Sequence, residues 1–294
     1  MTMAVSASPS TEAIREELDE SRRRGVLQRI VIPPCPELLA RLHETMALPE
    51  PDLNEVARIA SRDVAMAAVL LCQANGPMYA AGQPVQTVGQ AMNRLGLERT
   101  ASVMAGFLVQ RAIRVNSAHL QRFWERATKR AIAMTYLAHR FPGMSPDVAH
   151  TFGLFCHVGL PVMMQSVPGY SSTLVEARAR KDRAPIETEN FNHRTDHAVV
   201  GALVARVWRL APEVMAAIRL HHDLDILGDS RTDDEVQLLV ATGVLAEHMV
   251  LKHEGEEPDR DWVDAMGRVL NWLEVEPDEL DVWELELRDM FDAA

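Results

Sequence analysis

Helical periodicity is the feature that most constrains the fold of this chain. Apolar residues recur three and four positions apart along most of its length, as at Leu38, Leu39, Leu42 and Met46, which fall on one face of a helix. No segment of useful length alternates apolar and polar residues, the pattern typical of a half-buried strand. Aromatic residues make up only 5% of the chain, whereas strands favour them. The sequence therefore predicts an all-α fold.

Proline and charge divide the predicted helices into blocks. Pro33, Pro34 and Pro36 exclude a helix interior, so an extended segment should lead into the first block. We expect one domain with two lobes, flanked by a short N-terminal segment and a C-terminal extension. The predicted parts are residues 1–25 (flexible N-terminus with a short helix), 26–115 (N-terminal lobe), 116–225 (second lobe) and 226–294 (acidic helical extension).

Negative charge is concentrated at the C-terminal end. The chain has a formal net charge of −12, and residues 251–294 carry 15 acidic against four basic side chains, a net of −11. The remainder is thus nearly neutral, without the excess of basic residues that gathers a phosphate backbone. We therefore expect no nucleic-acid partner.

Three features predict a cytoplasmic protein. No apolar run approaches the roughly 20 residues needed to cross a bilayer, so we expect no membrane partner. Residues 1–10 lack the basic and then apolar pattern of a secretory signal. The widely spaced Cys35, Cys72 and Cys156 are typical of reduced structural thiols.

Several histidines of the second lobe are candidate metal ligands. His193 and His197 stand four residues apart, but Arg194 occupies the position of the glutamate in a His-Glu-x-x-His motif, which excludes a zinc protease. The favoured interpretation is a hydrogen-bonded polar seam inside the helical bundle. A pocket for a small ligand is a second alternative. A third is a structural zinc site with the ligands Cys156, His157, His197 and His221.

Five short segments carry recognisable motifs. They are Ile32-Pro33-Pro34-Cys35-Pro36, Ser61-Arg62-Asp63 through Ala74-Asn75, Val85-Gln86-Thr87 through Leu95-Gly96, Asp196-His197-Ala198 and Leu220-His221-His222. In this order they resemble the HDOD family, the HD-related output domain of bacterial signalling proteins. The resemblance covers most of the chain, from about Ile32 to about Glu247, and implies an HD-type helical bundle in which the second lobe is the HD-like lobe.

The resemblance also implies that the HD-type site is degenerate. Active HD proteins carry an adjacent His-Asp pair whose carboxylate bridges two cations. Here Cys156 and His157 hold those positions, and an imidazole cannot bridge metals in this way. Arg126 stands where the first histidine would come, and Glu247 near the last aspartate. We expect no catalytic residue, no metal and no cofactor. The implied pocket residues are Arg126, Cys156, His157, Asp196, His197, His221, His222 and Glu247.

Further expectations concern individual side chains. Arg126 should pair with Asp196 or Glu247, unless it lies on a solvated helix surface. The apolar neighbours of Cys156 predict a buried thiol rather than a nucleophile. Three tryptophans of the acidic extension either pack it onto the body, which is the favoured interpretation, or form an interaction face. They are Trp262, Trp272 and Trp283.

The expected function is that of a non-catalytic bacterial signal-transduction protein that acts through protein–protein interaction. The acidic extension is the candidate contact surface, because concentrated carboxylates steer a basic partner. The partner's identity stays open, as does self-association into a homo-oligomer. Two other functions remain as alternatives, a metal-dependent phosphohydrolase and a nucleotide or small-molecule sensor that uses the vacated pocket.

Overall fold

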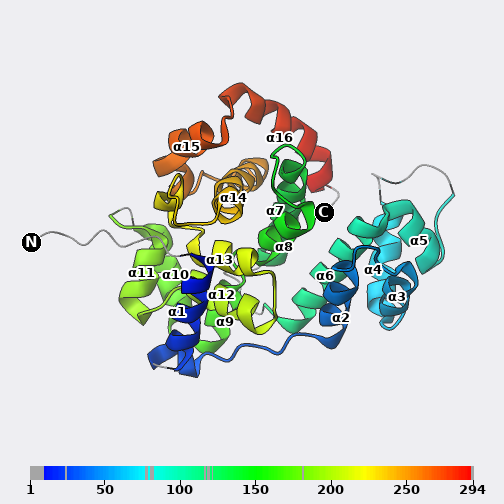
Figure 1. Ribbon diagram of the computed structural model, residues 1–294, viewed down its shortest axis with the longest axis horizontal. Coiled ribbons are helices and arrows are strands. Elements are labelled where there is room, and N and C mark those ends of the chain that lie inside the picture. The colour runs from blue at the N-terminus through cyan, green and yellow to red at the C-terminus, as the bar shows by residue number, and fades with distance from the viewer. Residues whose placement is uncertain are drawn as a thin grey trace, which may run out of the picture. The chain divides into compact units, whose positions relative to one another are not determined.

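A computed structural model describes most of the chain, and the regular secondary structure in the described part is helical (Figure 1). The described residues are 10–23, 25–76, 79, 83–115, 117, 120, 122–180 and 182–292. Within these ranges there is no strand, so the predicted all-α fold is confirmed. Residues 1–9 of the expected flexible N-terminus, and residue 116, where the second lobe was expected to begin, lie outside the described part.

The chain divides into two compact units. The first combines residues 1–32 with 116–288, and the second combines residues 33–115 with 289–294. The N-terminal helix and most of the acidic extension, which the sequence analysis set apart from the HD-like lobe, thus lie in the same unit as that lobe.

Local capping signals define the helices of the second unit. Asp52, Asp63 and Thr87 accept hydrogen bonds from the first backbone N–H groups of the helices that they precede. The Asn75 side chain holds the next segment in place, because it donates to the Val85 carbonyl (3.0 Å) and accepts from the Val85 N–H (2.8 Å). The helices are α2 (Glu37–Met46), α3 (Leu53–Ala60), α4 (Val64–Ala74), α5 (Val88–Leu95) and α6 (Leu97–Ala112).

The first unit contains the remaining helices. Its N-terminal part consists of α1 (Thr11–Arg23) and η1 (Gly25–Arg29). The HD-like lobe consists of α7 (Phe123–Ala138), α8 (Pro146–Phe155), α9 (Gly159–Ser166), α10 (Tyr170–Ala179), α11 (Pro185–His193), α12 (His197–Val207), α13 (Pro212–Leu220) and η4 (Leu224–Ile226). The chain ends with α14 (Asp234–His253), α15 (Arg260–Leu273) and α16 (Pro277–Asp292), of which residues up to Arg288 belong to this unit.

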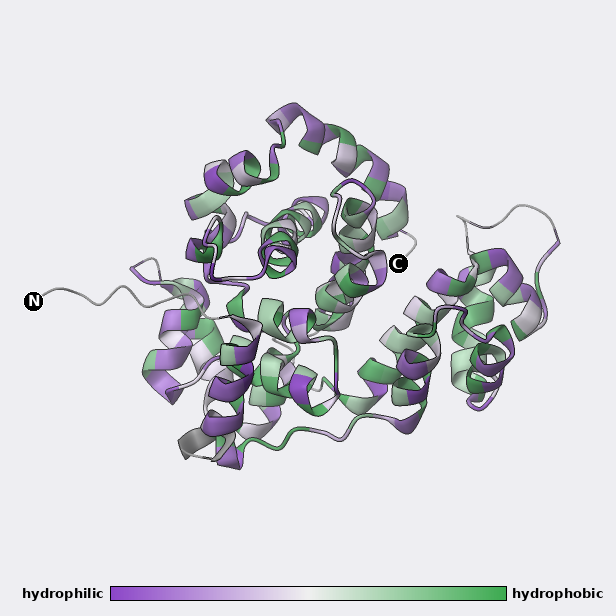
Figure 2. Ribbon diagram, viewed as in Figure 1, coloured by the Kyte–Doolittle hydropathy of each residue, from purple (hydrophilic) through white to green (hydrophobic). Residues whose placement is uncertain are grey.

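The core of the first unit forms around α14, which packs against α7, α8, α13 and α15. Its residues are largely hydrophobic, whereas those of α1 are largely hydrophilic (Figure 2). The α7 and α8 backbones approach closely because residue 153 is glycine: a Cβ there would lie 2.7 Å from the Ala131 Cα atom. This contact brings the C-terminal end of α8 against the middle of α7.

Both ends of the first unit are anchored to its body. Ile14 and Leu18 of α1 are fully buried, and α1 packs on α12 and α13. In the acidic extension, Trp262 and Trp283 are only 5% and 8% exposed, and Trp272 is half-buried. The favoured interpretation of the tryptophans as packing residues is therefore confirmed for Trp262 and Trp283.

No helix in the described ranges combines the length and the apolar character that a membrane span requires.

Candidate functional site

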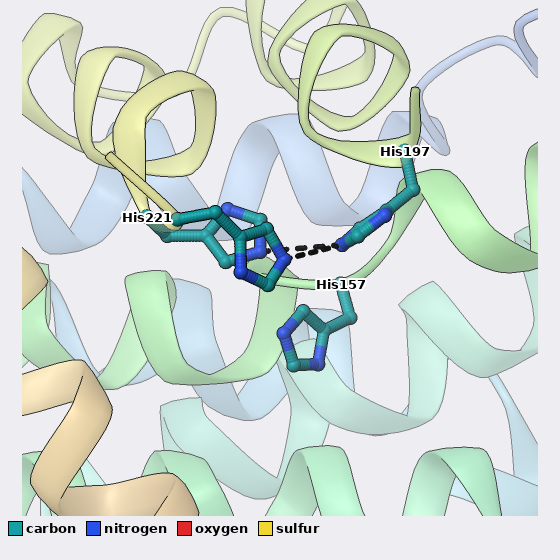
Figure 3. Close-up of side chains that lie close together, drawn as sticks. His157, His197 and His221 are labelled. Carbon is teal, nitrogen blue, oxygen red and sulfur yellow. Dashed lines mark hydrogen bonds between the residues drawn. The ribbon is translucent and has the colours of Figure 1, made fainter. Parts of the chain in front are cut away.

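Four histidines from three separate places in the first unit converge on one point. His157 lies between α8 and α9, His197 is the first residue of α12, and His221 and His222 directly follow α13. Figure 3 shows the rings of His157, His197 and His221 turned toward a common centre. Each of the four side chains offers a ring nitrogen, and these nitrogens all lie within 4.8 Å of one another. We call these four residues the histidine cluster.

Helix boundaries place these rings. The Asp196 carboxylate accepts a hydrogen bond from the Val199 N–H (2.9 Å), which starts α12 and makes His197 its first residue. Pro212 opens α13 with a backbone angle already suited to a helix, and the helix ends at Leu220, so that His221 is its C-terminal capping residue. The ends of several short helices thus meet at one point and bring together residues that are up to 65 positions apart in the sequence.

The Nε2 atoms of three cluster members are close to one another. The distance from His197 Nε2 to His221 Nε2 is 3.3 Å, and that from His197 Nε2 to His222 Nε2 is 3.1 Å. His197 and His221 are almost fully buried, while His157 and His222 are half-buried. The histidines do contact one another, as the polar-seam interpretation expected.

The opposite ring nitrogens of the same three histidines bind oxygen acceptors. His197 Nδ1 lies 3.0 Å from both carboxylate oxygens of Glu189, and His221 Nδ1 lies 2.7 Å from the Ile218 carbonyl oxygen. His222 Nδ1 contacts the Asp261 carboxylate. Because these oxygens can only accept, each Nδ1 carries a proton, and in a ring that is neutral the Nε2 atom facing the centre is then a bare lone pair.

Burial and neighbouring charges determine the protonation of the cluster. Burial lowers the pKa values of His157 and His221 well below the usual value, assisted by the Arg130 charge at His157 and by the His222 and His197 rings at His221, so both rings are neutral. Burial alone would also lower the pKa of His222, but its hydrogen bond to Asp261 raises that pKa overall. The histidines of the cluster therefore differ in their affinity for a proton: burial disfavours protonation of His157 and His221, whereas Asp261 favours it at His222.

A cavity of about 250 Å³ adjoins the cluster. Arg130 is 3% exposed within it, forms an ion pair with Glu247 and donates to the Gly153 carbonyl oxygen (3.2 Å). Burial raises the pKa of Asp259, another lining residue, to about 6. Cluster and cavity share one lining, so a molecule in the cavity would meet imidazoles on one side and the Arg130–Glu247 pair on another.

Arg126 lies elsewhere than expected. Its guanidinium binds Glu254 (2.7 Å) and Glu256, so the prediction that it pairs with Asp196 or Glu247 is wrong. It does not line the cavity. Arg130, one helical turn later on α7, is the arginine that does. The four-residue spacing places both arginines on one face of α7, which the sequence alone can show. Which of them reaches the cavity depends on how α7 packs against α8.

Asp196 also lies outside the cavity. Its carboxylate accepts from Val199 and from the Asn190 side chain (2.6 Å), and it lines a separate, more polar cavity of about 490 Å³. Cys156 does line the first cavity, but it is 4% exposed, and burial raises its thiol pKa to about 12. This thiol is packed, as expected. The sulfur does not belong to the histidine cluster, so the zinc alternative that included Cys156 identified three of its four members.

Four polar residues of the site were missed by sequence reasoning. Arg130, Glu189, Asp259 and Asp261 hold or face the predicted residues from α7, α11 and the start of α15. Glu189 lies eight positions before His197, and Asp261 lies in the acidic extension, so no local motif connects either carboxylate to its histidine.

A catalytic pair of metal ions of the HD type does not fit these residues. Within the described ranges the cluster consists of four imidazoles and contains no carboxylate oxygen. The Glu189 and Asp261 carboxylates sit behind the rings, bound to Nδ1 atoms, and Glu247 is engaged by Arg130. No carboxylate is thus placed to bridge two cations, which is the arrangement that stabilises both attacking and leaving oxygens.

Comparison with known proteins gives a consistent family assignment. The sequence profile of the HDOD domain family matches residues 32–224. An uncharacterised protein of Treponema pallidum (strain Nichols) is 23% identical over 229 residues, which cover 77% of this chain and 44% of that protein. The chain thus spans less than half the length of this curated relative.

Solved structures share the fold. A candidate signal transduction protein from Marinobacter aquaeolei VT8 is 20% identical with a TM-score of 0.74, over 99% of this chain and 66% of that chain. A candidate phosphohydrolase from Shewanella amazonensis SB2B is 21% identical with a TM-score of 0.70, over 95% and 94% of the two chains. At these identities the likeness establishes the helical fold.

Proposed function

Since the chain belongs to the HDOD domain family, we propose that it is a regulatory signalling protein that acts by binding partners and does not hydrolyse phosphoesters. The family places it among the domains of signalling proteins, and its structural neighbours include phosphohydrolase-like folds.

One observation carries the proposal: the position expected to supply a bridging carboxylate is His157, and its ring faces three further imidazoles. Hydrolysis of the HD type needs a carboxylate between two cations and a nucleophile between them. A neutral imidazole has one lone pair and cannot take that role. Among the carboxylates that line the cavity, Glu247 already compensates the buried Arg130 charge.

Covalent catalysis has no better support. The Cys156 thiol is buried, and its raised pKa of about 12 keeps it protonated at neutral pH, whereas a nucleophilic cysteine needs the thiolate. Partner binding is thus the remaining role within the proposal.

The outer face of α16 is the proposed contact surface for a basic protein. Leu280, Trp283 and Leu287 are buried along one stripe of this helix, while Val282 and Leu285 are 54% and 61% exposed. Acidic residues surround these two apolar side chains. Exposed apolar groups inside a charged rim are the usual composition of a protein interface, and the acidic rim steers a basic partner. The surrounding exposed acids are Asp278, Glu279, Asp281, Glu286 and Asp289.

The proposed setting is the cytoplasm. Cys35, Cys72 and Cys156 form no disulfide, and free thiols are typical of proteins kept in a reducing compartment.

Hydrolysis of phosphoesters is expected to stay at background. Purified protein would be assayed against phosphomonoesters, phosphodiesters, nucleotides and cyclic dinucleotides with Mn²⁺, Fe²⁺ or Mg²⁺ added, since these cations serve two-metal hydrolysis. Turnover that disappears in both His157→Ala and Glu247→Gln would contradict the proposal. Saturable nucleotide binding without turnover would instead support the sensor alternative.

Partner contact is expected to depend on Val282 and Leu285. A photo-crosslinking amino acid at position 285 should yield a dominant protein adduct in cells, and the same group at the 86% exposed Val64 of the other unit serves as the control. Val282→Ser combined with Leu285→Ser should weaken capture of that protein without changing the fold, because both side chains are already exposed. Capture that is equal at positions 285 and 64, or insensitive to salt, would exclude this surface.

A further inference from the structure

The spacing of the Nε2 atoms matches that of ligands around one small cation. Zinc–nitrogen bonds of about 2.0–2.1 Å in a tetrahedron place neighbouring nitrogens about 3.3–3.4 Å apart. The two Nε2 separations that involve His197 are 3.3 Å and 3.1 Å. The fourth ring, that of His157, offers a nitrogen within 4.8 Å of the others.

The hydrogen-bonded tautomers leave the Nε2 atoms of His197 and His221 without a donor between them. The Ile218 carbonyl can only accept, so His221 Nδ1 holds the proton of a neutral ring and its Nε2 is a bare lone pair. The Glu189 carboxylate fixes His197 in the same tautomer. Two bare nitrogens 3.3 Å apart repel each other, and a cation or a proton between them removes the repulsion.

The acceptors that bind the Nδ1 atoms are arranged as they are around metal-bound histidines. Such histidines donate their remaining ring N–H to a carboxylate or a backbone carbonyl, which orients the ring and makes its free nitrogen more basic. Here Glu189, Ile218 and Asp261 supply these acceptors for three of the four rings. Glu189 is 1% exposed, and the side chain that forms its ion pair is His197. This buried carboxylate therefore faces a positive charge only when the His197 ring is protonated or binds a cation.

We propose that His157, His197, His221 and His222 bind a single divalent transition-metal ion of the zinc class. Four imidazoles suit zinc, nickel or copper and disfavour magnesium, calcium and manganese, which prefer oxygen ligands. They also fill every position of a tetrahedral ion. A site closed in this way has no place for an activated water, so it ties chain segments together rather than hydrolysing a substrate. The inference thus goes beyond the proposed regulatory function and is compatible with it.

Such an ion would link three chain segments at one point. His157 lies at the α8–α9 junction, His197 at the start of α12, and His221 with His222 at the end of α13. Loading is therefore expected to raise the melting temperature of the first unit, because binding to the folded state alone stabilises it. A proton shared between His222 and His197 is the competing explanation of the short nitrogen contacts, and a metal titration separates the two.

The test uses zinc alone. Full-length protein, treated with a chelator and dialysed, is titrated with Zn²⁺ by calorimetry, and Co²⁺ is added in parallel because tetrahedral cobalt has intense visible absorption bands. One equivalent of Zn²⁺ should bind. His197→Gln and His221→Gln should each weaken binding at least about 100-fold, and Asp261→Asn about 10- to 100-fold through loss of the outer carboxylate charge that makes the His222 ring a stronger ligand.

His193→Gln is the matched control. His193 lies four residues before His197, binds the Thr173 hydroxyl (2.8 Å) and is not a cluster member, so its replacement should leave zinc affinity unchanged. Circular dichroism of each variant verifies folding. Wild-type protein that binds no zinc and no cobalt would overturn the proposal in favour of the shared proton. Binding that survives both His197→Gln and His221→Gln would also overturn it, since the ion would then sit elsewhere.

Discussion

Gly159→Ala should destabilise the first unit by at least about 3 kcal/mol. A Cβ at this position would lie 1.9 Å from the His197 carbonyl oxygen and 2.8 Å from the Gly201 backbone nitrogen. Both neighbours are backbone atoms at the start of α12, so no side chain can rotate away and α9 and α12 must separate. The same shift would move His157 and His197 apart, because each adjoins the displaced contact.

Tryptophan fluorescence during urea unfolding provides the measurement for this variant. All five tryptophans of the chain lie between residues 124 and 283, within the first unit, so their signal reports that unit. Gly267→Ala is the matched control: position 267 is exposed, nothing lies within 4 Å of the added Cβ, and alanine should stabilise α15 by about 0.5–1 kcal/mol. A Gly159→Ala variant as stable as the wild type would mean that α9 and α12 are not packed this closely.

Glu247→Gln should cost about 3–5 kcal/mol, the loss typical of breaking a buried ion pair from one side. The Arg130 side chain is only 4% exposed, and its partner is 14% exposed. Glutamine preserves the shape and a hydrogen-bond acceptor but leaves the buried guanidinium charge without its carboxylate. Replacing both residues, as in Arg130→Met with Glu247→Leu, should cost less than the single change, because no buried charge is then left alone.

A double-mutant cycle measures this coupling by urea unfolding. Asp264→Asn is the control, since the Arg260–Asp264 pair is exposed (38% and 61%) and such a pair contributes at most about 1 kcal/mol. If Glu247→Gln is as mild as Asp264→Asn, the Arg130 charge has another compensating group, and Asp259 in the same cavity would be the candidate.

Sequence patterns identified most of the histidine cluster for a local reason. His221-His222 follows a helix that begins with proline, and Asp196-His197 is a helix start with its capping residue. Capping and helix termination depend on a few neighbouring residues, so they can be recognised without the rest of the fold. The same signals could not reveal that His222 belongs to the cluster and Cys156 does not, because that depends on which way each side chain turns.

The two arginines of α7 illustrate what the sequence could not decide. Arg126 and Arg130 share one face of the helix, and the motif comparison selected the first as the pocket residue. In the structure Arg126 binds Glu254 and Glu256, while Arg130 reaches Glu247 and the Gly153 carbonyl. One helical turn, about 5.4 Å, separates an ion pair outside the cavity from one that lines it.

The sequence by itself determined the helical class and the family, because periodicity and capping are local properties. Only the tertiary structure decided which charged side chains surround the histidine cluster. Glu189, Asp261 and Arg130 reach the site from α11, α15 and α7, and the chain separates Asp261 from His222 by 39 residues. Such contacts depend on how helices pack, since packing sets which faces meet and at which register.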